Sequence, residues 1–178
     1  EDPDDTAAKR LHAAIMSIAA ADAEAGEPVA EFDGVSMVVP RGKVSIELHN
    51  THMRMQSSTL DFKVQYSSIV RVYLLPKPHS NQSHAVIALD PPIRKGQTFY
   101  PHILAMFNDD DHLTVEPNLA ADMKDKFPTL ESTYDGSSGE VFVRVLKNMA
   151  GVKLTRQSLF TASAGGHAIR VSHKADVG

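Results

Sequence analysis

The sequence contains no cysteine, and none of its apolar runs approaches the length of a membrane-spanning helix. Without cysteine the chain has no disulfide, no thiolate ligand for a metal ion and no cysteine nucleophile. A helix that crosses a bilayer needs about 20 apolar residues in succession, so we predict no membrane span. The chain begins with Glu1 rather than Met, which leads us to expect a fragment of a longer protein.

An excess of positive charge is also lacking, because the 178 residues carry a net charge of −4. Proteins that bind naked DNA without sequence preference need a basic footprint, so this balance argues against that function. Residues 1–33 hold nine acids and two bases, residues 34–108 three acids and eight bases, and residues 109–178 ten acids and eight bases. This uneven distribution leaves a basic or mixed protein partner open.

The motifs of common enzyme classes are missing as well. The sequence has no nucleophile elbow, no phosphate-binding glycine loop and no kinase signature. His49 and His52 flank an expected strand turn without a carboxylate at fitting spacing, so we do not expect a zinc site. The residues 109–112, Asp-Asp-Asp-His, lack the alternating ligands and the distal glutamate of a calcium loop. We therefore expect no enzymatic activity, no metal and no cofactor.

Alternating apolar and polar residues dominate the middle of the chain. In residues 44–49 Val, Ile and Leu alternate with Ser, Glu and His, as in a strand buried on one face. Similar segments recur up to Val115 and predict about seven short strands joined by tight turns, which is typical of a small antiparallel barrel or sandwich. The expected last strand starts at Leu113.

Helices are expected at three places. Residues 4–21 have apolar side chains at helical spacing, and a short helix is predicted from Asn118 to the region before Pro128. A stronger prediction begins at Ser137, where Ser137 and Glu140 form a capping-box pattern, and ends at Gly151 as the C-terminal cap. Its apolar stripe consists of Val141, Phe142, Val145, Leu146 and Met149. One amphipathic helix after the last strand can plug the open end of a barrel.

The segment of residues 85–107 carries the candidate recognition site. Two apolar runs, residues 85–89 and 103–107, predict buried strands, and Asp90, Pro91 and Pro92 are expected to end the first of them. Gly96 permits a turn, so the loop exposes four polar residues on a rigid base: Arg94, Lys95, Gln97 and Thr98. Such a loop is either an ordinary solvated hairpin or a recognition surface.

The same segment carries a family resemblance. Residues 89–103, LDPPIRKGQTFYPHI, resemble the signature of the structure-specific recognition protein family, the smaller subunit of the FACT histone chaperone. Supporting blocks occur in the same order at residues 39–43, 61–66, 74–76 and 174–178. The resemblance extends over about residues 28–178.

This resemblance implies a fold and a domain organisation. The fold is mainly β with capping helices: a pleckstrin-homology-like seven-strand barrel with a C-terminal helix, followed by the truncated start of a second such barrel. The expected divisions are an N-terminal helical extension over residues 1–27, a first domain over residues 28–152 and the second domain from residues 153–178.

The resemblance also implies a function. The family's middle domain binds core histones, and the complex reorganises nucleosomes during transcription and replication, so a nuclear, chromatin-associated location is expected. Gln97 is the strongest candidate for histone contact, followed by Arg94, Lys95 and Thr98, whereas Pro91, Pro92 and Gly96 shape the loop. The large FACT subunit is expected to bind through regions outside this chain, and DNA only indirectly.

Two other functions remain compatible with the sequence. A domain of this fold class can be a phosphoinositide-binding membrane module, for which Arg41, Lys43 and Arg54 are available, with Glu47 between them. Alternatively, it can be a purely structural scaffold within a larger assembly. Barrels of this kind host many functions, so the fold alone does not separate the three.

Overall fold

The computed structural model describes residues 26–77, 79–119 and 121–156. The helix expected over residues 4–21 lies outside the described residues, as does most of the expected second domain. Within the described part of the chain, no helix is long and apolar enough to cross a membrane.

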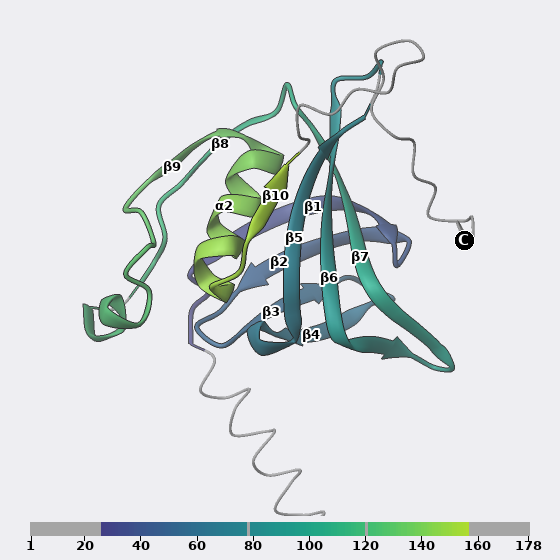
Figure 1. The fold of residues 1–178 in the computed structure, drawn as a ribbon, viewed down its shortest axis with the longest axis horizontal. Coiled ribbons are helices and arrows are strands. Elements are labelled where there is room, and N and C mark those ends of the chain that lie inside the picture. The colour runs from purple at the N-terminus through teal and green to yellow at the C-terminus, as the bar shows by residue number, and fades with distance from the viewer. Residues whose placement is uncertain (1–25, 78, 120, 157–178) are drawn as a thin grey trace, which may run out of the picture.

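Eight strands form one curled sheet in the order β10-β5-β6-β7-β1-β2-β3-β4. All neighbouring strands are antiparallel except β10 and β5, which are parallel. The sheet wraps around the helix α2 (Figure 1), as expected for a barrel whose open end is plugged by a C-terminal helix, so the predicted fold class is confirmed. The strands are β1 (Ala30–Val39), β2 (Gly42–Leu48), β3 (His52–Gln56), β4 (Asp61–Gln65), β5 (Ile69–Pro76), β6 (Gln82–Lys95), β7 (Thr98–Asn108) and β10 (Leu154–Arg156), with a 3-10 turn, η1 (Tyr66–Ser68), between β4 and β5.

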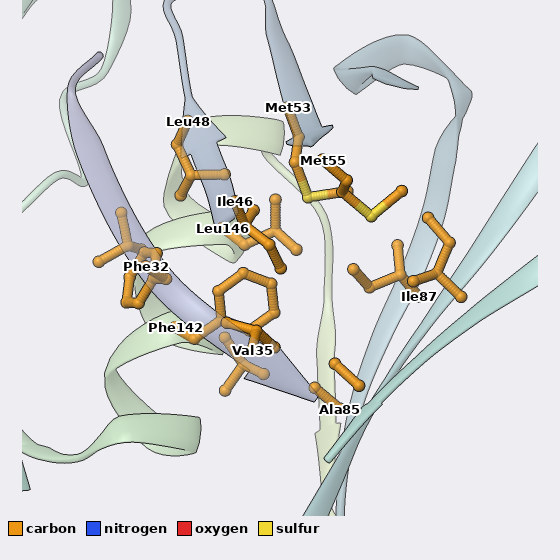
Figure 2. Packing of buried hydrophobic residues seen from close by; sticks show 14 of the residues in the cluster. Phe32, Val35, Ile46, Leu48, Met53, Met55, Ala85, Ile87, Phe142 and Leu146 are labelled. Carbon is orange, nitrogen blue, oxygen red and sulfur yellow. The ribbon is translucent and has the colours of Figure 1, made fainter. Parts of the chain in front are cut away.

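The predicted alternation places the core on the concave face of this sheet. In β2, Val44, Ile46 and Leu48 are buried while their neighbours are partly or fully exposed. The buried side chains of β3 and β4 extend the same layer, and Figure 2 shows Met53 and Met55 beside Ile46 in this core.

The helix α2 (Ser138–Ala150) fills the concave side of the sheet. Phe142 is fully buried and lies among Phe32, Val35 and Leu146 in Figure 2. The whole expected stripe of α2 is buried, and so is Val143, which lies outside it. The helix therefore has a second covered side, opposite the sheet.

That second side is covered by a two-stranded ribbon made of β8 (His112–Val115) and β9 (Tyr134–Ser137), both of which contact α2. Residues 113–115 were expected to close the barrel, but they pair with β9 instead of with the large sheet. β9 itself was not predicted. Figure 1 shows the ribbon and the sheet on opposite sides of the helix.

The two ends of α2 differ from each other in how well they match the sequence prediction. Gly151 is left-handed (φ 66°), and its N–H donates to the Lys147 carbonyl, so the predicted C-terminal cap is confirmed. The predicted capping box is wrong, because Ser137 occupies the cap position without a side-chain bond to the helix. Ser137 still belongs to β9, and the Ser138 N–H donates to the Asp111 carbonyl at 2.7 Å, so a neighbouring strand satisfies the helix amide. Glu140 pairs with Arg156 of β10 instead.

The short helix expected from Asn118 is a 3-10 helix, η2 (Ala121–Lys126). Asn118 does not cap it. The Asn118 N–H donates to the Val29 carbonyl at 2.8 Å, and its side-chain amide donates to Glu27 at 2.9 Å. Asn118 thus ties this connection to the start of β1.

β10 lies just beyond the expected domain boundary at residue 152. Its three residues pair with Val72, Tyr73 and Leu74 of β5. The first sheet therefore extends to Arg156, and the start of a second domain remains a prediction about the residues that follow.

Candidate functional site

The strand β6 does not end at Asp90, contrary to the sequence prediction. It continues through Pro91 and Pro92 to Lys95. Ala88 pairs with His102 and Ile93 with Tyr100, so residues 89–92 of β6 stand opposite Pro101 alone. Proline is tolerated at such a bulge because the irregular pairing does not require its missing N–H. The result is an outer hairpin, residues 93–100, instead of the expected loop.

A two-residue turn closes the outer hairpin. Lys95 pairs with Thr98, leaving Gly96 and Gln97 as the turn residues. Gly96 has φ +58°, and a positive φ at the first turn position only is the pattern of a type II′ turn. Figure 1 shows the tip projecting away from α2 and the β8–β9 ribbon. The prediction that Gly96 makes the turn is therefore confirmed.

The two cations of the predicted site are exposed, but their charged groups are turned toward the protein. The Arg94 Nε donates to the Gly96 carbonyl at 2.5 Å, and its guanidinium carbon lies 5.5 Å from the centre of the Phe99 ring. The Lys95 Nζ donates to the Thr59 carbonyl at 2.8 Å. Arg94 therefore braces the turn, and Lys95 ties the outer hairpin to the β3–β4 connection.

Gln97 and Thr98 are exposed at the tip, together with Phe99, which sequence reasoning missed. Phe99 is 58 % exposed, one of the two large apolar side chains with high exposure among the described residues. Its neighbour Tyr100 points the other way and packs edge-to-face against Phe62, with ring centres 6.3 Å apart. Because side chains alternate along a strand, the anchoring of Tyr100 directs Phe99 outward.

A groove of about 390 Å³ lies beneath the outer hairpin, between β4 and the proline bulge of β6. Asp61 at its edge receives two hydrogen bonds from the Arg54 guanidinium, each 3.1 Å long. Arg54 is one of the three cations available to a phosphoinositide, and its guanidinium is already engaged by this carboxylate.

His49 and His52, which we did not expect to form a zinc site, flank the β2–β3 turn, as predicted. Their rings stack with centres 4.8 Å apart, and the Glu47 carboxylate lies 3.1 Å from the His49 Nε2. Within the described residues, no cluster of three His, Cys, Asp or Glu side chains could hold a metal ion. The Tyr66 hydroxyl donates to the His49 carbonyl at 2.6 Å, and burial raises the pKa of Tyr66 above its ordinary value.

Comparison with known proteins gives a consistent result. A family model described as the SSRP1 PH domain matches residues 27–154, which include the outer hairpin and α2. The chain is 43 % identical over 181 residues to FACT complex subunit SSRP1-A of Oryza sativa subsp. japonica, covering 99 % of this chain and 28 % of that protein. It is 32 % identical over 180 residues to FACT complex subunit pob3 of Schizosaccharomyces pombe, covering 100 % of this chain and 35 % of that protein.

The chain thus spans between a quarter and about a third of the length of these relatives. Among solved structures, the Spt16D Pob3N heterodimer aligns with a TM-score of 0.40 and 7 % identity, covering 80 % of this chain and 61 % of that chain. The family model matches well over half of the residues, with the sheet and the plugging helix inside its bounds. The chain therefore belongs to the SSRP1 PH-domain family.

Proposed function

We propose that this chain is a histone-binding module of a FACT-type histone chaperone, without catalytic activity, that acts in nucleosome reorganisation during transcription and replication. The proposal is supported by membership of the SSRP1 PH-domain family and by relatives named as FACT complex subunits. In this proposal the module works on chromatin in the nucleus. Core histones are its direct partners, the large FACT subunit joins through regions outside this chain, and DNA is contacted only indirectly.

The outer hairpin is the observation that carries the proposal. Its turn is braced by Arg94, and its side is tied to the body of the sheet by Lys95. A segment that is ordered before binding loses little conformational freedom when a partner docks, which favours affinity. The exposed tip is therefore suited to protein recognition.

The chemistry of the tip suggests how it would contact a basic partner. Histones are rich in Lys and Arg, so direct approach to Arg94 and Lys95 is electrostatically unfavourable. Those two cations are turned toward Gly96, Phe99 and Thr59, whereas Gln97 and Thr98 are neutral. We assign hydrogen bonding with histones to Gln97 and Thr98, and the shaping of the tip to Arg94 and Lys95.

The test is binding of purified core histones to the full chain with Gln97→Lys. A new cation at the tip should weaken binding about tenfold, because it faces a basic surface. Ser132→Lys is the matched control, since Ser132 is exposed in the connection before β9, on the α2 side. Arg94→Ala combined with Lys95→Ala should also weaken binding by removing the bracing contacts.

The outcomes separate the site from the function. Unchanged affinity in both tip variants removes the outer hairpin from the histone site. Absence of histone binding by a longer chain that contains both expected domains contradicts the function itself.

A further inference from the structure

The strands β1 and β7 pair over only part of their length. Ser36, Met37 and Val39 of β1 pair with β7, whereas the same strand continues back to Ala30 in pairing with β2, with a bulge between Phe32 and Val35. β7 continues to Asn108 in pairing with β6. Within the described residues, the β7-facing edge of β1 therefore has no strand partner from Ala30 to Val35. An unpartnered strand edge presents backbone N–H and carbonyl groups that another extended chain can bond.

A groove of about 510 Å³ opens where the two strands separate. Its floor is apolar and includes Phe32 and Val35 of β1 and Phe107 of β7, all buried. Figure 2 shows Phe32 and Val35 packed beside Phe142 of α2, so the floor is the outer surface of the core. The far wall is formed by the start of β8 and by Ser138. The groove therefore has a packed apolar floor, with β1 on one side and the start of β8 on the other.

The charged residues that line this groove are acidic. They are Glu31 and Asp33 of β1 and Asp111 just before β8, and no Lys or Arg is among the lining residues. Asp33 accepts a hydrogen bond from Ser45 at 2.7 Å, and Asp111 accepts a long one from Asn108 at 3.4 Å, but neither pairs with a cation from the part of the chain that the structure describes. Lys43 flanks Gly34 from the β2 side, and His112 adds an imidazole ring at the far wall. The groove thus favours a cationic ligand.

We infer that this groove binds an extended, lysine- and arginine-rich segment of a partner protein by strand addition along β1. Such recognition uses backbone hydrogen bonds for affinity and alternate side chains for specificity. In the bound segment, every second residue would place its cationic side chain near Glu31, Asp33 and Asp111. The residues between them would pack on Phe32 and Val35. The inference rests on the proposed function only in expecting the segment to come from a basic histone partner.

The groove and the outer hairpin lie at opposite ends of β7. This strand has 11 residues, so its two ends are at most roughly 33 Å apart. The groove borders Met106, Phe107 and Asn108, whereas the hairpin turn precedes Thr98. A partner with a folded body and a basic extension can occupy both sites at once, and each site can then be tested separately.

The test measures binding of a fluorescein-labelled 12-residue peptide, in which Lys or Arg alternates with Ala or Thr, to the full chain by fluorescence anisotropy. Glu31→Gln combined with Asp111→Asn should weaken binding about tenfold at ~0.1 M salt, since each carboxylate attracts a cation of the peptide. The control is Glu116→Gln combined with Asp125→Asn, which removes the same charge from exposed positions that do not line the groove. It should bind within about twofold of the unaltered chain.

Amide hydrogen exchange with the peptide present should slow at residues 30–35 of β1 and stay unchanged at residues 93–100. The groove inference is overturned if the peptide does not bind, if both double variants bind it equally, or if exchange at β1 does not change. Those results leave the proposed function intact as long as folded core histones still bind the chain. Failure of core histones to bind the longer chain that contains both expected domains, with the peptide still bound at β1, would reject the function and keep the groove.

Discussion

At the scale of single residues, Phe142 joins three elements of the fold. Its ring meets Phe32 of β1 edge-to-face, with centres 5.2 Å apart and planes at 83°, and it lies 5.2 Å from the ring of Phe107 of β7 at 31°. Both partners form the floor of the groove beside β1. The contact of α2 with the sheet and the shape of the groove therefore depend on the same side chain.

Phe142→Ala should lower the free energy of unfolding by about 3–5 kcal/mol, because it leaves a cavity in a well-packed core. Urea unfolding followed by circular dichroism measures the change. Phe99→Ala is the matched control: that ring is largely exposed, so its removal should change stability by less than about 0.5 kcal/mol. Similar losses in the two variants would mean that Phe142 does not hold the core as described.

For single residues, the sequence predicts the solvent exposure of a side chain better than it predicts which residue that side chain will contact. The exposure of Arg94, Lys95, Gln97 and Thr98 follows from turn residues between apolar runs, and the structure places all four at the surface. The bond from Lys95 to Thr59 joins residues 36 positions apart. No local pattern encodes it, because it depends on how the β3–β4 connection meets the outer hairpin.

At the scale of elements, strands with strong alternation are predictable and irregular ones are not. β2 is identified by its period-two pattern, whereas β9 contains Asp135, Gly136 and Ser137 and buries only Tyr134. Residues 134–137 form a strand because they pair with β8 and pack on α2, so tertiary contacts and not the local sequence determine β9. The end predicted for β6 at Asp90 is wrong for a related reason, since the bulge removes the backbone bond that proline cannot make.

Tyr134 attaches the β8–β9 ribbon to α2. Its side chain is fully buried, and its hydroxyl oxygen accepts hydrogen bonds from the Asn148 amide at 2.7 Å and from the Glu131 N–H at 2.9 Å. Arg144 lies over the ring at 5.1 Å and pairs with Glu131 at 2.7 Å, and hydrogen bonding to Glu131 raises the pKa of Arg144 further. One tyrosine thus links α2, β9 and the preceding loop.

Tyr134→Phe should cost about 1–3 kcal/mol of stability, because two donors lose their acceptor while the packing of the ring is kept. Thermal and urea unfolding measure the loss. Tyr73→Phe on β5 is the control, with an expected change below about 0.5 kcal/mol, because Tyr73 is only partly buried. Equal stability of the two variants would contradict the linking role of Tyr134.

At the scale of the whole molecule, the distribution of acidic and basic residues along the sequence differs from their distribution over the folded structure. Six of the eight bases in residues 34–108 lie on strands of the sheet, and the excess is detectable from composition alone. The meeting of Glu31 and Asp33 with Asp111 is not detectable, because about 80 residues separate them and only the divergence of β1 from β7 makes them neighbours. The sequence therefore indicates that the charge of the chain is compatible with a basic protein partner, but it does not indicate where such a partner would bind.

Global stability should fall at alkaline pH because of Tyr66. Burial raises the pKa of Tyr66 in the folded state, so this group contributes stability that is fully present below its unfolded pKa of about 10. As pH rises further, the unfolded chain loses the proton while the folded chain keeps it, and stability falls by up to about 1.4 kcal/mol per pH unit.

Urea unfolding between pH 8 and pH 11, with Tyr66→Phe alongside, measures this loss. The variant should be less stable at pH 8, because the bond to the His49 carbonyl is gone, but its stability should decline less steeply above pH 10. Parallel declines in the two proteins would exclude Tyr66 as a source of the alkaline sensitivity.

The bulge at residues 89–92 also affects solubility. Beyond Leu89, β6 has lost its pairing with β5, so the outer hairpin has a side without a strand partner among those of residues 26–156 that the structure describes, and such an edge invites association with other molecules. Pro91, Pro92 and Pro101 have no N–H to offer along the edges of the outer hairpin, and Arg94 and Lys95 add like charge. The same residues that shape the protruding hairpin thereby protect it against edge-to-edge aggregation.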